Sequence, residues 1–189
     1  MEKIGVVFLD RDGVINKYPG DKEYVKSWEE FHFLYGIKSA LKELQKNGFK
    51  IFIISNQAGV AKRIYSEKAL NKITENMLNE LRKNRIKIDG VYYCIHQEKD
   101  NCLCRKPKTG LLDKAISKLN SEGYCLDPLK SYFIGDTIRD IQTGKARGLK
   151  TILVFSGKEK PEDKATWQVL PDYTALNLSE AVKIILNKI

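Results

Sequence analysis

The chain has 189 residues, of which 42% are hydrophobic and 30% are charged, as is typical of one globular domain. Lysine and arginine outnumber aspartate and glutamate by 33 to 24, but the basic residues are spread along the chain and form no block. No apolar run approaches the roughly 20 residues that span a bilayer, and we find no clustered basic and aromatic residues of the kind that bind nucleic acid.

The first predicted element is a nearly all-apolar run from Ile4 to Leu9, which is typical of a strand covered on both faces. Because no basic-then-apolar leader precedes it, we expect a cytoplasmic protein. The run ends in Asp10-Arg11-Asp12-Gly13, where two carboxylates repel each other and a glycine permits a turn. One acid of such a pair can attack while the other protonates a leaving oxygen. Taken alone, the stretch also fits a strand followed by a polar turn.

Strands and helices alternate along the rest of the chain, after an irregular aromatic loop over residues 17–35. The further predicted strands are 49–54, 91–95, 131–134 and 151–155. The predicted helices are 37–44, 67–81, 111–119, 138–147 and 178–189, with a polar loop over 157–166 before the last one. This alternation predicts a single domain over residues 1–189, with the α/β fold of a three-layer, doubly wound parallel sheet.

Several of these strands end in polar side chains. They are Asp10 and Asp12 after the first strand, Ser55 and Asn56 after the second, Lys106 beyond the third, and Asp136 after the fourth. The carboxyl ends of parallel strands meet at one edge of a sheet, so we expect these side chains to converge. Carboxylates there would bind Mg²⁺ together with phosphate oxygens, while Lys106 and Ser55 would hold a phosphoryl group. Each residue alone has an ordinary explanation, but the combination favours phosphoryl transfer.

These motifs resemble the four signatures of the haloacid dehalogenase superfamily, as they stand in its phosphatases. They are Asp10-Arg11-Asp12-Gly13, Ser55-Asn56, Lys106, and Gly135-Asp136-Thr137-Ile138-Arg139-Asp140. The resemblance covers nearly the whole chain and implies that Asp10 is the nucleophile, which becomes an aspartyl-phosphate. It implies that Asp12 is the general acid and then the base, and that Asp10, the backbone carbonyl of Asp12, and Asp136 bind Mg²⁺. Asp140 would contact these ligands without binding the metal itself. The lack of a long insertion implies that there is no cap domain.

Three of the four cysteines, Cys94, Cys102 and Cys104, fall within eleven residues, together with His96. In a chain without a secretion signal this favours a metal over disulfides, and three thiolates with one imidazole would form a closed, structural Zn²⁺ site. From the spacing alone, unpaired thiols beside an incidental histidine remain the alternative. Cys125 stands apart, and we expect it to be buried or partly buried.

The cysteine loop and the Arg105-Lys106-Pro107 that follows it are similar to a signature of one subgroup, the histidinol-phosphate and D,D-heptose 1,7-bisphosphate phosphatases. That resemblance implies a zinc loop that shapes the entrance of the site and positions Arg105 and Lys106. The segment 56–61 is similar to the heptose group, although Lys62-Arg63 replaces its usual Arg-Gly. The resemblance therefore implies substrate-binding residues at Asn56, Gln57, Lys62, Arg63 and Arg105.

We thus expect a Mg²⁺-dependent phosphatase that removes the 7-phosphate of D-glycero-D-manno-heptose 1,7-bisphosphate, a precursor of nucleotide-heptose and lipopolysaccharide. A second phosphate would need cations of its own, whereas Lys62 and Arg63 would repel the amine of histidinol phosphate. Histidinol phosphate is the alternative substrate; a 3′-phosphorylated polynucleotide and a non-catalytic phospho-ligand binder are less favoured. We expect a monomer that acts on a small phosphorylated sugar, without nucleic acid or membrane partners.

Overall fold

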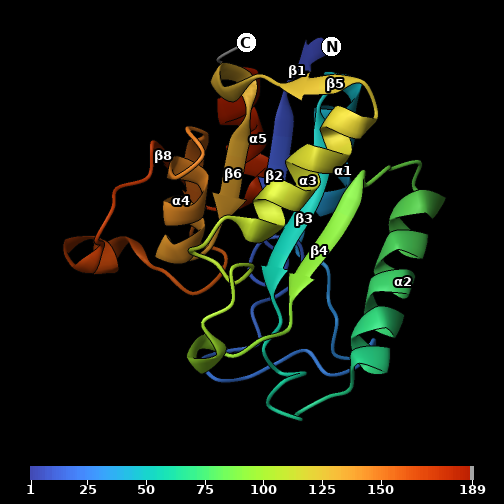
Figure 1. Ribbon diagram of the computed structural model, residues 1–189, viewed down its shortest axis with the longest axis vertical. Helices are drawn as coiled ribbons and strands as arrows, with labels where there is room; N and C mark the ends of the chain where they lie inside the picture. The colour runs from blue at the N-terminus through green and yellow to red at the C-terminus, as the bar shows by residue number, and fades with distance from the viewer. Residues whose placement is uncertain (188–189) are drawn as a thin grey trace.

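The computed structural model describes residues 1–187. Its middle layer is a six-stranded parallel sheet in the order β4-β3-β2-β6-β7-β8 (Figure 1). The strands of this sheet are β2 (Val6–Leu9), β3 (Lys50–Asn56), β4 (Gly90–Cys94), β6 (Tyr132–Gly135), β7 (Lys150–Val154) and β8 (Tyr173–Ala175). A separate pair of parallel strands, β1 (Glu2–Ile4) and β5 (Tyr124–Leu126), lies beside its upper end in Figure 1.

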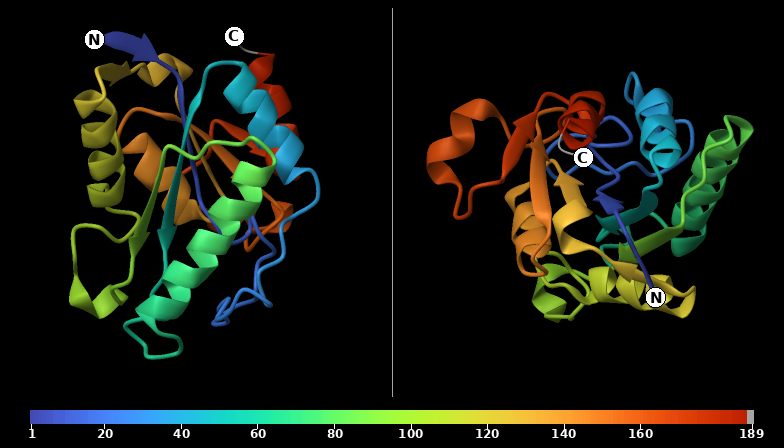
Figure 2. Two further views of the ribbon diagram at one scale, coloured as in Figure 1. Left: turned by 90° about the vertical axis from the view of Figure 1, so that its right-hand side faces the viewer. Right: turned by 90° about the horizontal axis from the view of Figure 1, so that it is seen from above.

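Helices cover both faces of the sheet because alternate strand residues are apolar toward each side. In β2, Val7 and Leu9 belong to one buried cluster, whereas Val6 and Phe8 belong to the other. The helices on the first face are α1 (Ile37–Lys46), α2 (Glu67–Lys83) and α5 (Leu178–Leu186), and those on the second are α3 (Gly110–Ser121) and α4 (Ile138–Lys145) (Figures 1 and 2). Short 3₁₀ turns occur at Glu98–Asp100, Pro128–Lys130 and Pro161–Thr166.

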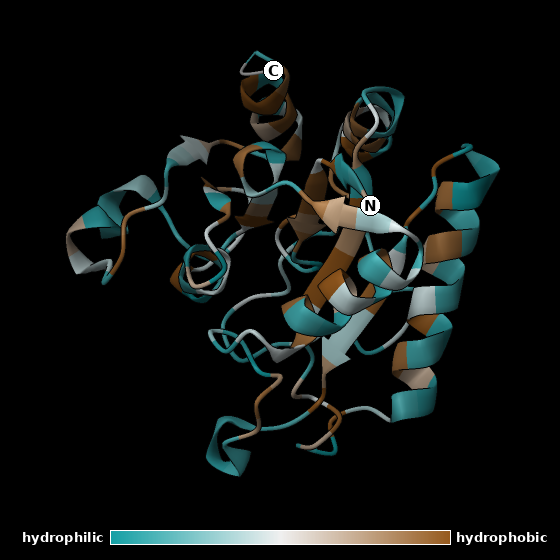
Figure 3. Ribbon diagram, turned by 45° about the horizontal axis from the view of Figure 1, so that its top comes forward, coloured by the Kyte–Doolittle hydropathy of each residue, from teal (hydrophilic) through white to brown (hydrophobic). Residues whose placement is uncertain are grey.

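Hydropathy follows this layering. The middle strands of the central sheet and the inward faces of the helices are hydrophobic, while the outer helix faces are hydrophilic (Figure 3). In the described part of the chain, no helix is both long and apolar enough to cross a membrane. The sheet therefore has two buried faces, so that the polar side chains of a site can lie only at the ends of its strands.

The predicted fold class is confirmed, and all five predicted helices are present. Ser66 caps α2 through the backbone N–H of Ala69, and Asn177 caps α5 through that of Glu180, as the sequence indicates. The last predicted helix is observed as far as Leu186, and positions 188–189 of the predicted range lie outside the described residues.

The prediction of one strand from Ile4 to Leu9 is wrong. The chain changes direction at Gly5, so that β1 leaves the main sheet and pairs with β5. A Cβ at Gly5 would lie 2.7 Å from the Phe49 ring and 2.9 Å from the carbonyl oxygen of Lys130. Only glycine fits this crossing without displacing its neighbours. The strands β5 and β8 and the turn at Pro161–Thr166 were not predicted, since such short segments show no clear periodicity.

The carboxyl ends of the parallel strands point to one end of the molecule, the lower end in Figure 1. The loops that follow β2, β3, β4 and β6 gather there, whereas both chain termini lie at the opposite end (Figure 1). The polar residues at the strand ends are therefore brought together by the topology.

Candidate active site

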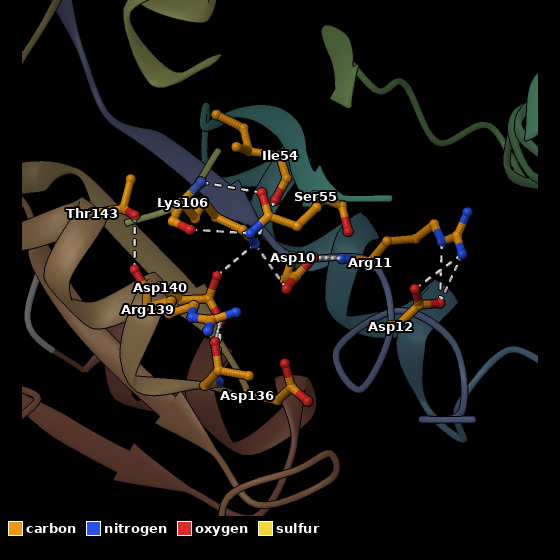
Figure 4. A network of polar contacts seen from close by, with 12 residues as sticks. Asp10, Arg11, Asp12, Ile54, Ser55, Lys106, Asp136, Arg139, Asp140 and Thr143 are labelled. Atoms are coloured by element: carbon orange, nitrogen blue, oxygen red, sulfur yellow. Dashed lines mark hydrogen bonds and ion pairs between the residues drawn. The ribbon is translucent and has the colours of Figure 1, made fainter. Parts of the chain in front are cut away.

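The centre of the site is a buried ammonium group between two buried carboxylates. The Nζ of Lys106 lies 2.8 Å from Oδ2 of Asp10 and also pairs with Oδ1 of Asp140 (Figure 4). It donates a third bond to the carbonyl oxygen of Ile54, at 3.0 Å. Burial alone would lower the pKa of Lys106, but the two carboxylates outweigh it and raise that pKa above its usual range. Lys106 therefore carries a fixed positive charge beside Asp10.

The backbone of Lys106 is held by the end of β3. The side chain of Asn56 accepts a hydrogen bond from the N–H of Lys106 at 3.1 Å and donates one to its carbonyl oxygen at 3.2 Å. This reciprocal pair ties the loop between β4 and α3 to the neighbouring strand. The predicted convergence of Asn56 and Lys106 on Asp10 is thus observed, although they lie far apart in the sequence.

Asp136 follows β6 and completes a cluster of acids. Carboxylate oxygens of Asp10, Asp136 and Asp140 lie within 4.8 Å of one another. The backbone N–H of Lys158 donates to Asp136 at 2.8 Å, and Gly13 and Gly157 pack so closely that a Cβ at either position would overlap its carboxylate.

Three buried carboxylates face a single lysine, so the cluster carries an excess of negative charge. Burial, with Asp140 adding to it and Lys106 opposing it, raises the pKa of Asp10 to about 6. Burial and then the charges of Asp10 and Asp140 raise the pKa of Asp136 well above its usual range. A set of hard oxygen donors with excess negative charge fits Mg²⁺.

Asp140 is the acid least free to bind that cation. One of its oxygens pairs with Lys106, and the other accepts from the N–H and hydroxyl of Thr137 at the start of α4. Asp10 and Asp136, which the sequence analysis selected, are therefore the candidate carboxylate ligands, and Asp140 takes the supporting position expected for it.

A cavity of about 230 Å³ opens above this cluster. Its lining comes from the predicted motifs, from the loop over residues 18–24, and from two further basic residues, Arg139 and Lys158. The predicted site residues that line it are Asp10, Asp12, Ser55, Asn56, Arg105, Lys106 and Asp136. Arg139 and Lys158 were missed, although both follow strands whose ends point to this edge, and that position was the available signal.

Three predicted substrate-binding residues do not line the cavity: Gln57, Lys62 and Arg63. Gln57 is buried, and its amide donates to Asp12 and Ser55 and accepts from the hydroxyl of Tyr65. Lys62 is exposed over the ring of Tyr24, and Arg63 is exposed at a turn. Gln57 therefore supports Asp12 from the protein interior. Direct contact of Gln57, Lys62 and Arg63 with substrate stays a prediction.

The cysteine loop forms a second possible metal site at the end of β4. The three thiols and the Nδ1 of His96 have five contacts between 3.2 and 3.7 Å. A disulfide needs a sulfur–sulfur distance of about 2.05 Å, whereas two thiolates on one tetrahedral Zn²⁺ lie about 3.8 Å apart. The cluster therefore fits Zn²⁺ with all four positions filled by protein. Cys125 lies outside it, partly buried on β5.

The cysteine loop over residues 94–104, called the zinc loop below, is joined to the active site through Arg105. Its guanidinium donates to the carbonyl oxygen of His96 at 3.2 Å, and Lys106 is the next residue. A metal at the cluster would thus hold the segment that carries both cations.

Known proteins resemble the chain over most of its length. A model of the family described as polynucleotide kinase 3 phosphatase matches residues 5–151. The D-glycero-alpha-D-manno-heptose-1,7-bisphosphate 7-phosphatase of Campylobacter jejuni is 39% identical over 161 residues, 85% of this chain and 88% of that protein. The D-glycero-beta-D-manno-heptose-1,7-bisphosphate 7-phosphatase of Haemophilus ducreyi is 38% identical over 160 residues, 80% of this chain and 84% of that protein. The chain belongs to the haloacid dehalogenase superfamily of phosphatases, in the family of these heptose bisphosphate phosphatases.

A solved structure extends this likeness to the fold. The D,D-heptose 1,7-bisphosphate phosphatase of B. bronchiseptica, crystallised with magnesium and phosphate, has a TM-score of 0.85 and 26% identity. The alignment covers 98% of this chain and 100% of that one. The predictions of a phosphatase, of its superfamily and of Mg²⁺ and Zn²⁺ as its cofactors are confirmed.

The acid cluster predicts how Mg²⁺ affects stability. The raised pKa of Asp10 means that, without metal, ionising this group in the native state costs stability as the pH rises from 3.8 toward about 6. Mg²⁺ should offset this cost, because a cation that binds only the native state stabilises it. The increase in melting temperature on adding Mg²⁺ should therefore be large at about pH 7.5 and shrink toward about pH 5.

Thermal unfolding with and without Mg²⁺ measures this increase. Asp136→Asn should lose most of it, while Asp113→Asn, which changes a surface carboxylate paired with Arg147, should keep it. An increase that is equal at both pH values, or that survives in Asp136→Asn, would contradict a magnesium site at these acids.

The cysteine cluster predicts about one zinc per chain in protein purified without chelator. Cys102→Ser should lower the zinc content and the melting temperature, and activity should fall because Arg105 and Lys106 lose their support. Metal analysis, thermal unfolding and phosphate release measure these three effects. Cys125→Ser is the matched control and should change none of them. Zinc-free protein with an unchanged melting temperature would refute a structural zinc site.

Proposed function

We propose that the chain is a Mg²⁺-dependent phosphatase that removes the 7-phosphate of D-glycero-D-manno-heptose 1,7-bisphosphate through an aspartyl-phosphate on Asp10. The observation that carries the chemistry is the buried pairing of Lys106 with Asp10 beside Asp136. A single domain over residues 1–189, monomeric and cytoplasmic, is part of the proposal.

In the first step a carboxylate oxygen of Asp10 attacks phosphorus, and the bond from phosphorus to the sugar oxygen breaks. The backbone N–H of Arg11 and the ammonium of Lys106, at 2.6 and 2.8 Å, hold the Asp10 carboxylate in one orientation. Lys106 and the hydroxyl of Ser55 hold the phosphoryl oxygens, and Asp12 gives its proton to the departing oxygen. Asp10, the backbone carbonyl of Asp12, and Asp136 would hold Mg²⁺, which would supply positive charge for the transferring phosphoryl group.

In the second step a water molecule replaces Asp10 on phosphorus. Asp12, now ionised, takes a proton from that water, and inorganic phosphate leaves. Asp10 returns to its starting state, still paired with Lys106. The same two aspartates therefore serve both halves of the reaction.

The charges around the cavity support a bisphosphate as substrate. Besides Lys106, the basic residues of the lining are Lys22, Arg105, Arg139 and Lys158, and Asp21 and Glu23 are its acidic residues outside the catalytic motifs. Arg139 and Lys158 form exposed ion pairs with Glu98 and Asp21, which are weak and can open to a stronger anion. Arg105 is the candidate for direct contact with a second phosphate, because a guanidinium binds phosphate with two parallel hydrogen bonds. The same charges disfavour histidinol phosphate, whose far end is a cationic amine.

A 3′-phosphorylated nucleic acid end is the second candidate substrate, because the matching family model is described by that activity. The relatives at 38–39% identity are named for heptose bisphosphate instead, one for the alpha and one for the beta anomer. We rank the sugar first because these relatives are named for it.

The test is kcat/KM for phosphate release across four substrates: both heptose bisphosphate anomers, histidinol phosphate and a 3′-phosphorylated oligonucleotide. One of the heptose anomers should be preferred. Arg105→Ala should lower kcat/KM for it by about tenfold to a hundredfold, the value of a charge-assisted hydrogen bond. Arg82→Ala, which removes an exposed arginine from α2, is the control and should change little.

Preference for histidinol phosphate or for the oligonucleotide would overturn the substrate assignment while leaving the phosphatase chemistry in place. An Arg105→Ala enzyme with unchanged kcat/KM on the bisphosphate would remove Arg105 from substrate binding.

A further inference from the structure

Arg11 is a fully buried arginine that forms a fork with its neighbour in sequence. Its Nη2 lies 2.9 and 3.0 Å from the two carboxylate oxygens of Asp12, and its Nε lies 3.1 Å from Oδ1. The guanidinium has no solvent exposure, while the Asp12 side chain is 22% exposed. The arginine therefore holds the carboxylate from the protein interior, while Asp12 itself lines the cavity.

The guanidinium is itself fixed by the aromatic core. It lies 6.0 Å from the centre of the Phe31 ring and 5.7 Å from that of Tyr93. These rings come from the loop over 17–35 and from β4, so two distant segments enclose it. An enclosed, planar fork allows its partner little freedom of direction.

Two further side chains complete the support of Asp12. Asn16 donates to Oδ1 at 2.8 Å, and Gln57 donates to Oδ2 at 2.9 Å. Gln57 is in turn held by the hydroxyl of Tyr65 at 2.7 Å. Each oxygen of Asp12 thus has a second donor besides Arg11, and every one of these donors comes from the protein interior.

Burying an arginine is a costly way to stabilise a fold, because a well-packed apolar residue of similar size often serves better. The fork of Arg11 instead restricts the orientation of the Asp12 carboxylate. In Figure 4 Asp12 and Lys106 lie on opposite sides of Asp10, so the proton donor and the phosphate-binding cation approach the nucleophile from two sides. The hydrogen bonds from Arg11, Asn16 and Gln57 therefore fix the orientation of the Asp12 carboxylate.

We propose that Arg11 is a positioning residue, which fixes the direction of the Asp12 carboxylate toward the departing oxygen, with Gln57 as a second support. The inference rests on the proposed function, in which the bond from phosphorus to Asp10 forms, the bond to the sugar oxygen breaks, and the proton of Asp12 moves to that oxygen. The Arg11 side chain is fully buried, so it would touch neither substrate nor phosphorus and would act only through Asp12.

The test compares two leaving groups on the same preparation. A sugar alkoxide is a poor leaving group and needs the proton, whereas p-nitrophenolate leaves as a stable anion and needs it little. Arg11→Met should lower kcat/KM for heptose bisphosphate by about a hundredfold, the size of a misplaced catalytic group, and kcat/KM for p-nitrophenyl phosphate by less than about threefold. The ratio of the two constants does not depend on the fraction of folded protein.

Four further variants sharpen the comparison. The quantity compared is kcat/KM for heptose bisphosphate divided by kcat/KM for p-nitrophenyl phosphate. Asp12→Asn shows the largest decrease of this ratio that loss of the proton donor can cause. Arg11→Lys should decrease the ratio less than Arg11→Met does, and Gln57→Leu should also decrease it by a smaller factor. Gln57→Leu also keeps the test valid if Arg11→Met does not fold. Ser131→Ala removes a buried hydrogen bond to the N–H of Val6 at the far end of the sheet, and its ratio should equal that of wild type.

Equal losses on both substrates in Arg11→Met and Gln57→Leu would reduce these residues to structural ones and overturn the inference. Wild-type protein that hydrolyses neither phosphate ester would instead overturn the proposed function, so the two failures are distinguishable.

Discussion

The structure depends on one buried charge arrangement, in which Lys106 lies between Asp10 and Asp140. With Asp136 close by, three carboxylates share a single ammonium in a region of low dielectric. Such a site is stable only if each group has fixed partners and if a further cation can enter. The hydrogen bonds from the backbone N–H of Lys106 to Asn56 and from that of Thr137 to Asp140 supply the partners. The remaining negative charge favours a divalent cation such as Mg²⁺, and that cation together with Lys106 would attract an anionic phosphoryl group.

The zinc loop explains how the lysine reaches this position. Between β4 and α3 the only regular structure is the short turn at Glu98–Asp100, so this segment has little support of its own. The cluster of three thiols and one imidazole, together with the bond from Arg105 to His96, ties it down. A metal bound to this cluster therefore stabilises the segment, as buried apolar side chains stabilise the rest of the fold.

Much of the site could be predicted because it depends on where strands end. Apolar runs locate strands, and in a parallel sheet the residues after them must meet, which brings Asp10, Ser55 and Asp136 together from the sequence alone. The direction of a side chain depends on packing that no local pattern records. Thus Gln57, expected to face substrate, turns inward to Asp12, and Lys158 enters the cavity unpredicted. The bend at Gly5 was missed for the same reason, since its cause is the distant Phe49.

The central claim, that Asp10 is the nucleophile, is tested most directly by trapping the covalent intermediate. p-Nitrophenyl phosphate, whose leaving group needs little help from a proton, is mixed with the Asp12→Asn enzyme, in which hydrolysis of the intermediate is slowed, and the reaction is quenched with acid within milliseconds to seconds. Borohydride then reduces an acyl phosphate to an alcohol, and peptide mass spectrometry locates the change. Conversion of Asp10, and of no other carboxylate, to homoserine is expected. Phosphate release without any modified Asp10, or with the modification on another residue, would contradict it.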